Sequence, residues 1–267
     1  MDKVSEFPRG VLYAKKSDEK YSLTRLKPSS VLSGIIETFW FVSWDLSDKE
    51  PHVQQNIPDP CINIVFEADV AKVVGAVTKR YSVELFGKGR IFGIKFIPGG
   101  FYSLTGMEVS KFTDSDLSIK QFFGKETNEL IKEINATSNI KQMVQLSENF
   151  FQSQILKLKR NANEVVSIVS LISNDLSILR VIDLSRKTGL SERNLQRLFK
   201  EQVGVSPKWV IRKYRIQEVL SRLEEGNYDW QQLVSQLDYF DQSHFIKDFK
   251  SLIGVTPVEY IKQLSTD

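Results

Sequence analysis

Cysteine and histidine are nearly absent from this chain. Its 267 residues include one cysteine, Cys61, and two histidines, His52 and His244. A single cysteine excludes an intramolecular disulfide framework and is typical of a protein in a reducing cytoplasm. We expect Cys61 to be a small buried residue rather than a redox sensor. The histidines have no partners at metal-ligand spacing, so we expect no metal, no cofactor and no histidine-based catalysis.

Long apolar runs and phosphate-binding glycine loops are also missing. The opening residues, MDKVSEFPRG, lack the apolar segment of a signal peptide, and no run approaches membrane-spanning length. The PGGF segment at 98–101 has only two glycines and no following lysine-serine pair, which favours a plain turn over an anion site. Hydrophobic residues make up 41% and charged residues 26% of the chain, as in an ordinary soluble globular protein. We expect a cytoplasmic protein without membrane contact.

The sequence predicts β-structure in the first part of the chain. Residues 1–30 are polar and irregular, and short β-prone runs punctuated by Pro and Gly follow them. These runs lie at 35–46, 62–68, 72–77, 81–87 and 91–97. Strands without intervening helical patterns predict an antiparallel barrel or sandwich and argue against a parallel nucleotide-binding sheet.

From residue 114 onward the apolar period becomes helical. Helices are expected at 124–136, 139–159 and 162–173, and SNDLS at 173–177 offers a helix stop followed by a new N-cap. We therefore expect an α+β protein of two domains. Residues 1–165 would form a β-rich sensor or dimerisation domain with helices at its end, and residues 175–267 an all-α domain.

The all-α segment contains one unit twice. Residues 190–210 (LSERNLQRLFKEQVGVSPKWV) align without a gap on residues 240–260 (FDQSHFIKDFKSLIGVTPVEY). Each copy has an N-cap, Ser191 or Asp241, and a glycine about three turns later, Gly204 or Gly254. A serine-proline or threonine-proline pair then restarts a helix. With the short amphipathic helices expected upstream, at 181–189 and 230–239, each copy has the helix-turn-helix layout.

The two copies differ in charge. Residues 180–215 contain ten basic and three acidic side chains, a net charge of +7, whereas residues 216–267 contain four basic and nine acidic side chains, a net charge of −5. The first copy presents a polar face opposite its apolar stripe, formed by Arg193, Gln196, Arg197 and Lys200. Arg and Gln suit bidentate hydrogen bonds with guanine and adenine edges. A single basic helix is more often just solvated, but the repeat, the caps and the charge together favour DNA binding.

The second copy offers a weaker polar face. Its outward side chains are Gln242, Ser243, Lys247 and Lys250. Ile246 occupies the position of Gln196, and it would contact either a thymine methyl or nothing.

These residues resemble a known family. The stretch LSERNLQRLFKEQVGVSPKWVIRKYRIQEVLSRL with the closing DQSHFIKDFKSLIGVTPVEY is similar to the DNA-binding domain of AraC/XylS-type bacterial transcription regulators, over about 180–264. The resemblance implies two helix-turn-helix subdomains joined by a linker helix at about 207–224. It implies base contacts from Arg193, Gln196 and Arg197, and weaker ones from Gln242, Ser243 and Lys247. Both recognition helices would enter one DNA face about 34 Å apart.

Two positions depart from that family, and the N-terminal half resembles it less specifically. Asp238 stands where the family usually has glycine, and Val234 where it usually has alanine, so we expect the geometry of the second recognition helix, called the second reader below, to differ from the family's. The segments IPDPCINIVFE, VVGAVT and GIKFIPGGFYSLTG resemble uncharacterised sensor-like domains of such regulators. That resemblance implies effector binding or dimerisation and names no ligand.

The sequence thus predicts a sequence-specific DNA-binding transcription regulator, an activator, with double-stranded DNA as its partner. RNA polymerase, a small effector and a second copy of the chain are further expected partners. Trp40, Trp44, Phe96 and Phe101 are weak candidates to line an effector pocket, because such aromatic residues are mostly core. One alternative is a ligand-free regulator whose first domain only dimerises. Another is a DNA-targeted enzyme, which the scarcity of His and Cys and the lack of a carboxylate constellation disfavour.

Overall fold

Strands dominate the first half of the chain. The computed structural model describes residue 12 and residues 20–155, 163–226, 232, 234, 235, 239 and 241–265. Within these ranges six strands form an antiparallel sheet in the order β1-β2-β7-β4-β5-β8, and β3 pairs with β6. The strands are β1 (Ser22–Leu26), β2 (Ile36–Leu46), β3 (His52–Asn56), β4 (Asn63–Glu67), β5 (Val70–Val74), β6 (Tyr81–Leu85), β7 (Gly87–Phe96) and β8 (Asp116–Ser118). The expected β-rich domain is confirmed as open sheets, since β1 and β8 are unclosed edges among the described strands.

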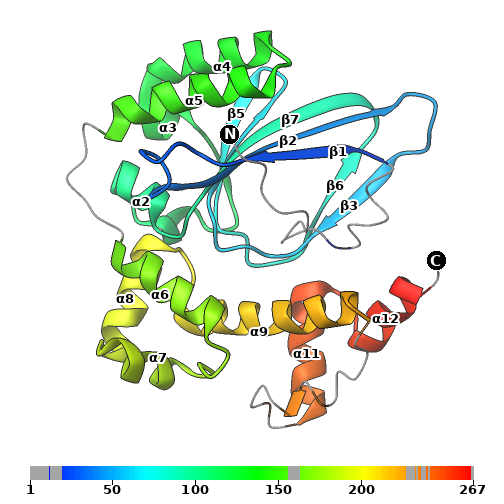
Figure 1. Ribbon diagram of the computed structural model, residues 1–267, viewed down its shortest axis with the longest axis vertical. Coiled ribbons are helices and arrows are strands. Elements are labelled where there is room, and N and C mark those ends of the chain that lie inside the picture. The colour runs from blue at the N-terminus through cyan, green and yellow to red at the C-terminus, as the bar shows by residue number, and fades with distance from the viewer. Residues whose placement is uncertain are drawn as a thin grey trace.

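Helices cover the sheet and form the second half. They are α2 (Gly100–Thr105), η1 (Val109–Phe112), α3 (Lys120–Phe123), η2 (Gly124–Glu126), α4 (Thr127–Ala136), α5 (Ile140–Ile155), α6 (Asn163–Asn174), α7 (Val181–Thr188), α8 (Glu192–Gln202), α9 (Pro207–Glu224), α11 (Gln242–Ile253) and α12 (Pro257–Ser265). Figure 1 shows α4 and α5 above the sheet and the layer from α6 to α12 below it. The α+β class is confirmed. None of the helices among these residues is long and apolar enough to cross a membrane.

Two details differ from the expected elements. Residues 116–118, expected in a helical region, form the edge strand β8, which pairs with β5 in the register Lys72↔Ser118. The PGGF turn continues into the short helix α2. Gly99 has φ 83°, which favours glycine, and a Cβ at Gly100 would collide with the backbone carbonyl of Ile35.

Alternation along β2 and β7 separates the two faces of the sheet. Phe39 and Phe96 are fully buried, and the ring of Phe96 lies edge-to-face against Phe151 of α5 at 5.7 Å. Because neighbouring strand residues point to opposite faces, Trp40 and Trp44 lie on the other side of the sheet.

The apolar core is divided within the helical half. One continuous core runs from the sheet through α2, η1, α4, α5 and α6 to α7, α8 and the first turns of α9. A second core joins the later turns of α9 to α11 and α12. The predicted linker helix at 207–224 is therefore observed as α9, and it belongs to both cores. The first helix-turn-helix subdomain shares its core with the sheet, whereas the second packs in a separate core that also includes Leu12 and Ile57 of the N-terminal half.

Candidate nucleic-acid interface

The first predicted reader is helix α8. Helix α7 ends at Gly189, whose φ of 73° makes the left-handed turn that glycine accepts most easily. Ser191 then caps α8, its hydroxyl accepting a hydrogen bond from the backbone N–H of Asn194 at 3.2 Å. Helix, tight turn and capped helix thus form as the sequence predicts.

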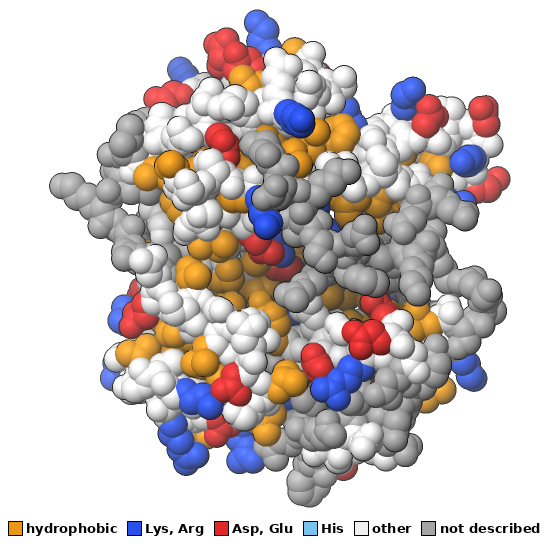
Figure 2. All heavy atoms as spheres, in the orientation of Figure 1, with side chains coloured by type: hydrophobic (Ala, Val, Ile, Leu, Met, Phe, Trp, Pro, Cys, Tyr) orange, Lys and Arg blue, Asp and Glu red, His pale blue; other side chains and the backbone are white. Residues whose placement is uncertain are grey.

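The polar face of α8 is open to solvent. Leu195, Leu198 and Phe199 are buried, and they fix the helix against the core. The four side chains predicted to face DNA are all exposed: Arg193, Gln196, Arg197 and Lys200. Figure 2 shows Lys and Arg side chains gathered at the lower left, over the region of α7 and α8 in Figure 1.

The second predicted reader is helix α11. Asp241 caps it by accepting a hydrogen bond from the N–H of His244 at 2.7 Å, and Gly254 ends it with φ 89°. Its predicted DNA-facing residues Gln242, Ser243 and Lys247 are exposed. Ile246, for which an exposed position was expected, is half-buried and packs against the second core.

The preceding helix of the second reader is described only in part. Residues 232, 234 and 235 are helical, and Val234 is 5% exposed within the second core. Asp238 lies outside the described residues.

Both copies restart with the same cap. Ser206 accepts a hydrogen bond from the N–H of Trp209 at 3.2 Å, with Pro207 at the first helical position of α9. In the second copy the hydroxyl of Thr256 accepts from the N–H of Glu259 at 3.3 Å, and the Glu259 carboxylate accepts from the Thr256 N–H at 2.7 Å. This reciprocal pair is a capping box.

Three basic residues of the +7 segment do not project from the readers. Arg212 pairs with Asp248 of α11, with 3.1 Å between Nε and the carboxylate, and thereby joins α9 to the second reader. Lys213 is 8% exposed, and burial lowers its pKa. The guanidinium of Arg215 lies 4.2 Å from the ring centre of Tyr239. These side chains are engaged within the protein, so the positive surface available to phosphates is smaller than the sequence charge suggests.

Lys213 interacts electrostatically with a partly buried charge cluster of the sheet domain. In this cluster Lys95 pairs with Asp59 at 3.1 Å and with Glu37 at 3.2 Å. Burial alone would raise the pKa of Asp59, but the charges of Lys95 and Lys213 hold it well below its usual value. Burial raises the pKa of the Cys61 thiol well above its usual value, which disfavours the reactive thiolate.

The sheet domain contacts the glycine turn that ends each reader. The hydroxyl of Thr113 donates a hydrogen bond to the carbonyl of Gly204 at 2.8 Å, and Lys200 pairs with Glu108 at 3.4 Å. In the second copy, a Cβ at Gly254 would collide with the guanidinium of Arg80. Thr113, Glu108 and Arg80 could not be predicted from the sequence, because no spacing or motif marks a contact between distant segments.

The four aromatic candidates for an effector pocket do not share a cavity. Trp40 and Trp44 pack over Gly93 and Gly89, their cross-strand partners, where a Cβ would collide with the indole rings. Phe96 and Phe101 are core residues in edge-to-face contact at 5.3 Å. The residues that do line a cavity in this domain come from β2, β4, the β4–β5 turn, β7, α4 and α5.

The residues that the structure describes include no group of three His, Cys, Asp or Glu side chains placed to hold a metal ion. His52 lies on β3, where its Nε2 is 3.4 Å from the Gln54 Oε1. His244 is in the first turn of α11, and its ring contacts Tyr239 at 5.3 Å.

Comparison with known proteins identifies both parts of the chain. A family model described as a helix-turn-helix domain matches residues 184–263, and one described as a domain of unknown function, DUF6597, matches residues 24–118. The multiple antibiotic resistance protein MarA of Escherichia coli K12 is 30% identical over 105 residues, which are 38% of this chain and 83% of MarA. The chain belongs to the AraC/XylS-type family of transcription regulators. Proteins of this family are not normally enzymes.

Two further transcription regulators match over a smaller share of their length. An uncharacterised HTH-type regulator of Haemophilus influenzae is 25% identical over 45% of this chain and 40% of that protein. The raffinose operon regulatory protein RafR of Pediococcus pentosaceus is 28% identical over 41% of this chain and 39% of RafR. The match thus spans about two fifths of each relative. Among solved structures, ToxT from Vibrio cholerae aligns over 93% of this chain and all of that chain, with 13% identity and a TM-score of 0.40. This structural similarity is too low to support a conclusion about function.

Proposed function

We propose that this protein is a transcription regulator that binds specific DNA sequences in the cytoplasm through α8 and α11. The observation that carries the proposal is the pair of capped helices with buried inner stripes and exposed polar faces, one in each copy of the repeat. In this proposal Arg193, Gln196 and Arg197 contact base edges and Lys200 contacts a phosphate. Gln242, Ser243 and Lys247 supply weaker contacts.

The two recognition helices contribute unequally to DNA binding because their exposed side chains differ. The exposed face of α8 carries two arginines and a glutamine, which form bidentate pairs with purines. The face of α11 carries Gln242, Ser243 and Lys247, while Ile246 turns partly into the core. We therefore propose that α8 supplies most of the affinity for DNA. Helix α11 fixes the position of the protein along the DNA and supplies a smaller share of the sequence discrimination.

Selection from a randomised duplex library tests this proposal. We expect enrichment of one sequence with two elements separated by about 10 base pairs, one helical turn. The double variant Arg193→Ala/Arg197→Ala should lose enrichment of the first element only. The control Lys132→Ala/Lys141→Ala removes the same charge from exposed positions on α4 and α5 and should select the wild-type sequence. Enrichment of no sequence by the wild type, or an unchanged selection by the first variant, would refute the proposal.

Activation is the second part of the proposal. Residues 216–267 carry a net charge of −5, and an acidic surface suits contact with a basic face of RNA polymerase. Transcription in vitro from a promoter bearing the selected sequence should rise when the protein is added. A fall would make the protein a repressor and remove the polymerase contact from the proposal.

The sheet domain has a role in either case. Its contacts with both glycine turns, through Thr113 and Arg80, support a role in setting the relative position of the two readers. We propose that an effector or a second copy of the chain acts through this domain. Native mass measurement of the full chain, with and without its DNA, distinguishes a bound small molecule from a dimer.

A further inference from the structure

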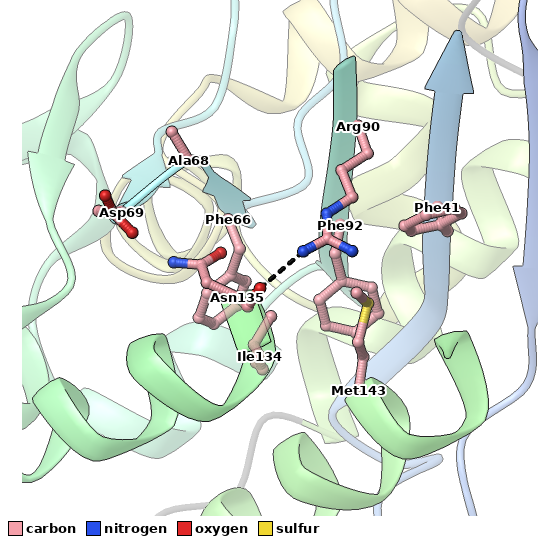
Figure 3. Close-up of a pocket in the computed structure, with 9 residues that line it drawn as sticks. All are labelled: Phe41, Phe66, Ala68, Asp69, Arg90, Phe92, Ile134, Asn135 and Met143. Carbon is pink, nitrogen blue, oxygen red and sulfur yellow. Dashed lines mark hydrogen bonds between the residues drawn. The ribbon is translucent and has the colours of Figure 1, made fainter. Parts of the chain in front are cut away.

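The sheet domain contains a small cavity between the sheet and the helices α4 and α5. Its volume is about 140 Å³. The lining residues come from β2, β4, the β4–β5 turn, β7, α4 and α5, and Figure 3 shows them. Phe66, Phe92, Ile134 and Met143 are buried, and with the half-buried Phe41 they give the cavity apolar walls. The DNA-reading helices contribute nothing to its lining, so a ligand here would not compete directly with DNA.

A fixed cation faces this cavity. Arg90 of β7 is half-buried, and its Nη2 donates a hydrogen bond to the backbone carbonyl of Asn135 at 2.6 Å. No carboxylate among the described residues forms an ion pair with Arg90. One edge of the guanidinium is therefore held by the end of α4, while its remaining N–H groups are available to an acceptor.

A second donor at the cavity has no partner among the described residues. The side-chain nitrogen of Asn135 is buried and has no hydrogen-bond partner within the described part of the chain. Figure 3 shows the nitrogen of this amide on the side of Asp69 and its oxygen on the side of the Arg90 guanidinium. A buried donor left unpaired costs about 1–3 kcal/mol, so such groups call for a partner. One bound oxygen acid would satisfy both donors.

The turn at the rim is strained. Ala68 has φ 48° in the two-residue turn between β4 and β5, a conformation in which glycine is preferred. Backbone strain of this kind is concentrated at binding sites, and here it positions the residues that close one side of the cavity. Asp69, also in this turn, is exposed at the rim.

We propose that this cavity binds a small monocarboxylate with a short apolar body. The carboxylate accepts hydrogen bonds from Arg90 and from the amide of Asn135, and the apolar part packs against Phe92 and Met143. An apolar cavity of roughly this volume holds a molecule the size of benzene, which limits the body to about six carbon atoms. The ligand class deepens the proposed function, because a bound carboxylate would be the effector of the regulator.

Calorimetric titration of the full chain tests this inference without DNA, so its failure leaves the DNA-binding proposal untouched. The probes are straight-chain and cyclic carboxylates of four to eight carbons, their neutral amides and their amines. We expect saturable binding of at least one carboxylate, with binding of its amide and amine at least about tenfold weaker, because an arginine-carboxylate pair is bidentate and charge-assisted. The same carboxylate should raise the unfolding temperature in a concentration-dependent way.

Two variants locate the site. Arg90→Gln should weaken carboxylate binding at least about tenfold, the loss expected when a bidentate charged pair is removed. Asn135→Asp should weaken it similarly, since it keeps the side-chain shape and replaces the donor by a negative charge. The control Lys72→Gln removes an exposed cation from β5, outside the cavity, and should bind as the wild type does.

Several results would overturn the inference. The inference fails if no carboxylate binds at concentrations up to about 10 mM, because a weaker affinity would be too low for an effector. Equal binding of the amide would leave an apolar cavity without an anion site, and unchanged binding by both variants would place the site elsewhere. Tighter binding of leucine than of 4-methylpentanoate would show that the site prefers a zwitterion, whose ammonium group pairs with Asp69, over a monocarboxylate.

Discussion

The hydroxyl of Thr113 donates a hydrogen bond to the backbone carbonyl of Gly204 at 2.8 Å. Thr113 follows η1 in the sheet domain, and Gly204 ends the first reader, so this bond joins the two halves of the molecule across 91 positions of sequence. It uses a carbonyl left without a helical partner at the end of α8. The glycine therefore serves both as a left-handed turn, with φ 87°, and as a docking point.

Thr113→Val tests the strength of this connection. The substitution keeps the branched shape and removes the hydroxyl, so we expect the free energy of unfolding to fall by about 1 kcal/mol. Thr137→Val is the control, because the Thr137 hydroxyl, just before α5, donates to Gln142, accepts from the Asn139 N–H and does not contact α8. Denaturant titration measures both. Equal small losses for the two variants would show that the Thr113 bond contributes no more than an exposed one.

Glu108→Gln tests whether the sheet domain withholds a cation from DNA. Glu108 pairs with Lys200 at 3.4 Å and also accepts from the Ser110 hydroxyl at 2.6 Å, a bond that glutamine preserves. Releasing Lys200 from this pair should strengthen its proposed phosphate contact, so affinity at low salt should rise. The slope of log K against log salt should steepen by up to about 0.9.

Fluorescence anisotropy across a salt series measures this slope. Glu133→Gln removes the same charge from an exposed position on α4 and is the control for net charge. Identical slopes for the two variants would mean that Lys200 either reaches DNA already or never does.

Substitutions on the two readers test their unequal roles. Arg197→Ala should cost about 1–3 kcal/mol on the selected sequence and relax specificity at one base pair. Its pair with Glu201, at 3.4 Å and exposed, is too weak to prevent a base contact. Arg193→Ala should reduce affinity more than Gln242→Ala does. Competition binding with single-base variants checks each value, and equal losses at Arg193 and Gln242 would remove the dominance of α8.

Local signals in the sequence predicted the helical half well. Caps and turns depend on short-range hydrogen bonds and on backbone conformation, so Ser191, Asp241 and Gly254 could be assigned from their neighbours alone. The start and end of α9 agree with the range implied by the family. The five predicted strand runs were displaced by only a few residues, since alternation marks a strand's middle better than its ends, whereas β3 and β8 were not predicted as strands.

Contacts between distant segments could not be predicted from the sequence. Nothing in the pattern around Glu108 or Arg80 points to the ends of α8 and α11, because such contacts arise only when two folded surfaces meet. The inward position of Lys213, by contrast, could have been predicted from the sequence. Lys213 lies three residues after Val210 and three before Ile216, both buried, so helical spacing alone places it on the apolar stripe.

Lys213→Met tests the cost of that buried charge and its pH dependence. Burial lowers the pKa of Lys213 in the folded protein below the value it takes when unfolded. Between these two values the unfolded chain binds more protons, so the contribution of this group to stability increases as the pH rises. The charged form is therefore unfavourable at neutral pH, where methionine fills a similar volume without a charge.

We expect Lys213→Met to raise the unfolding temperature at pH 7, with a gain that shrinks as the pH approaches the ordinary lysine pKa near 10.5. Thermal unfolding at a series of pH values measures the difference from wild type. Lys208→Met, an exposed position on the same helix, should show no such trend. A variant that is less stable than wild type at pH 7 would show that attraction to Asp59 outweighs the cost of burying the ammonium group.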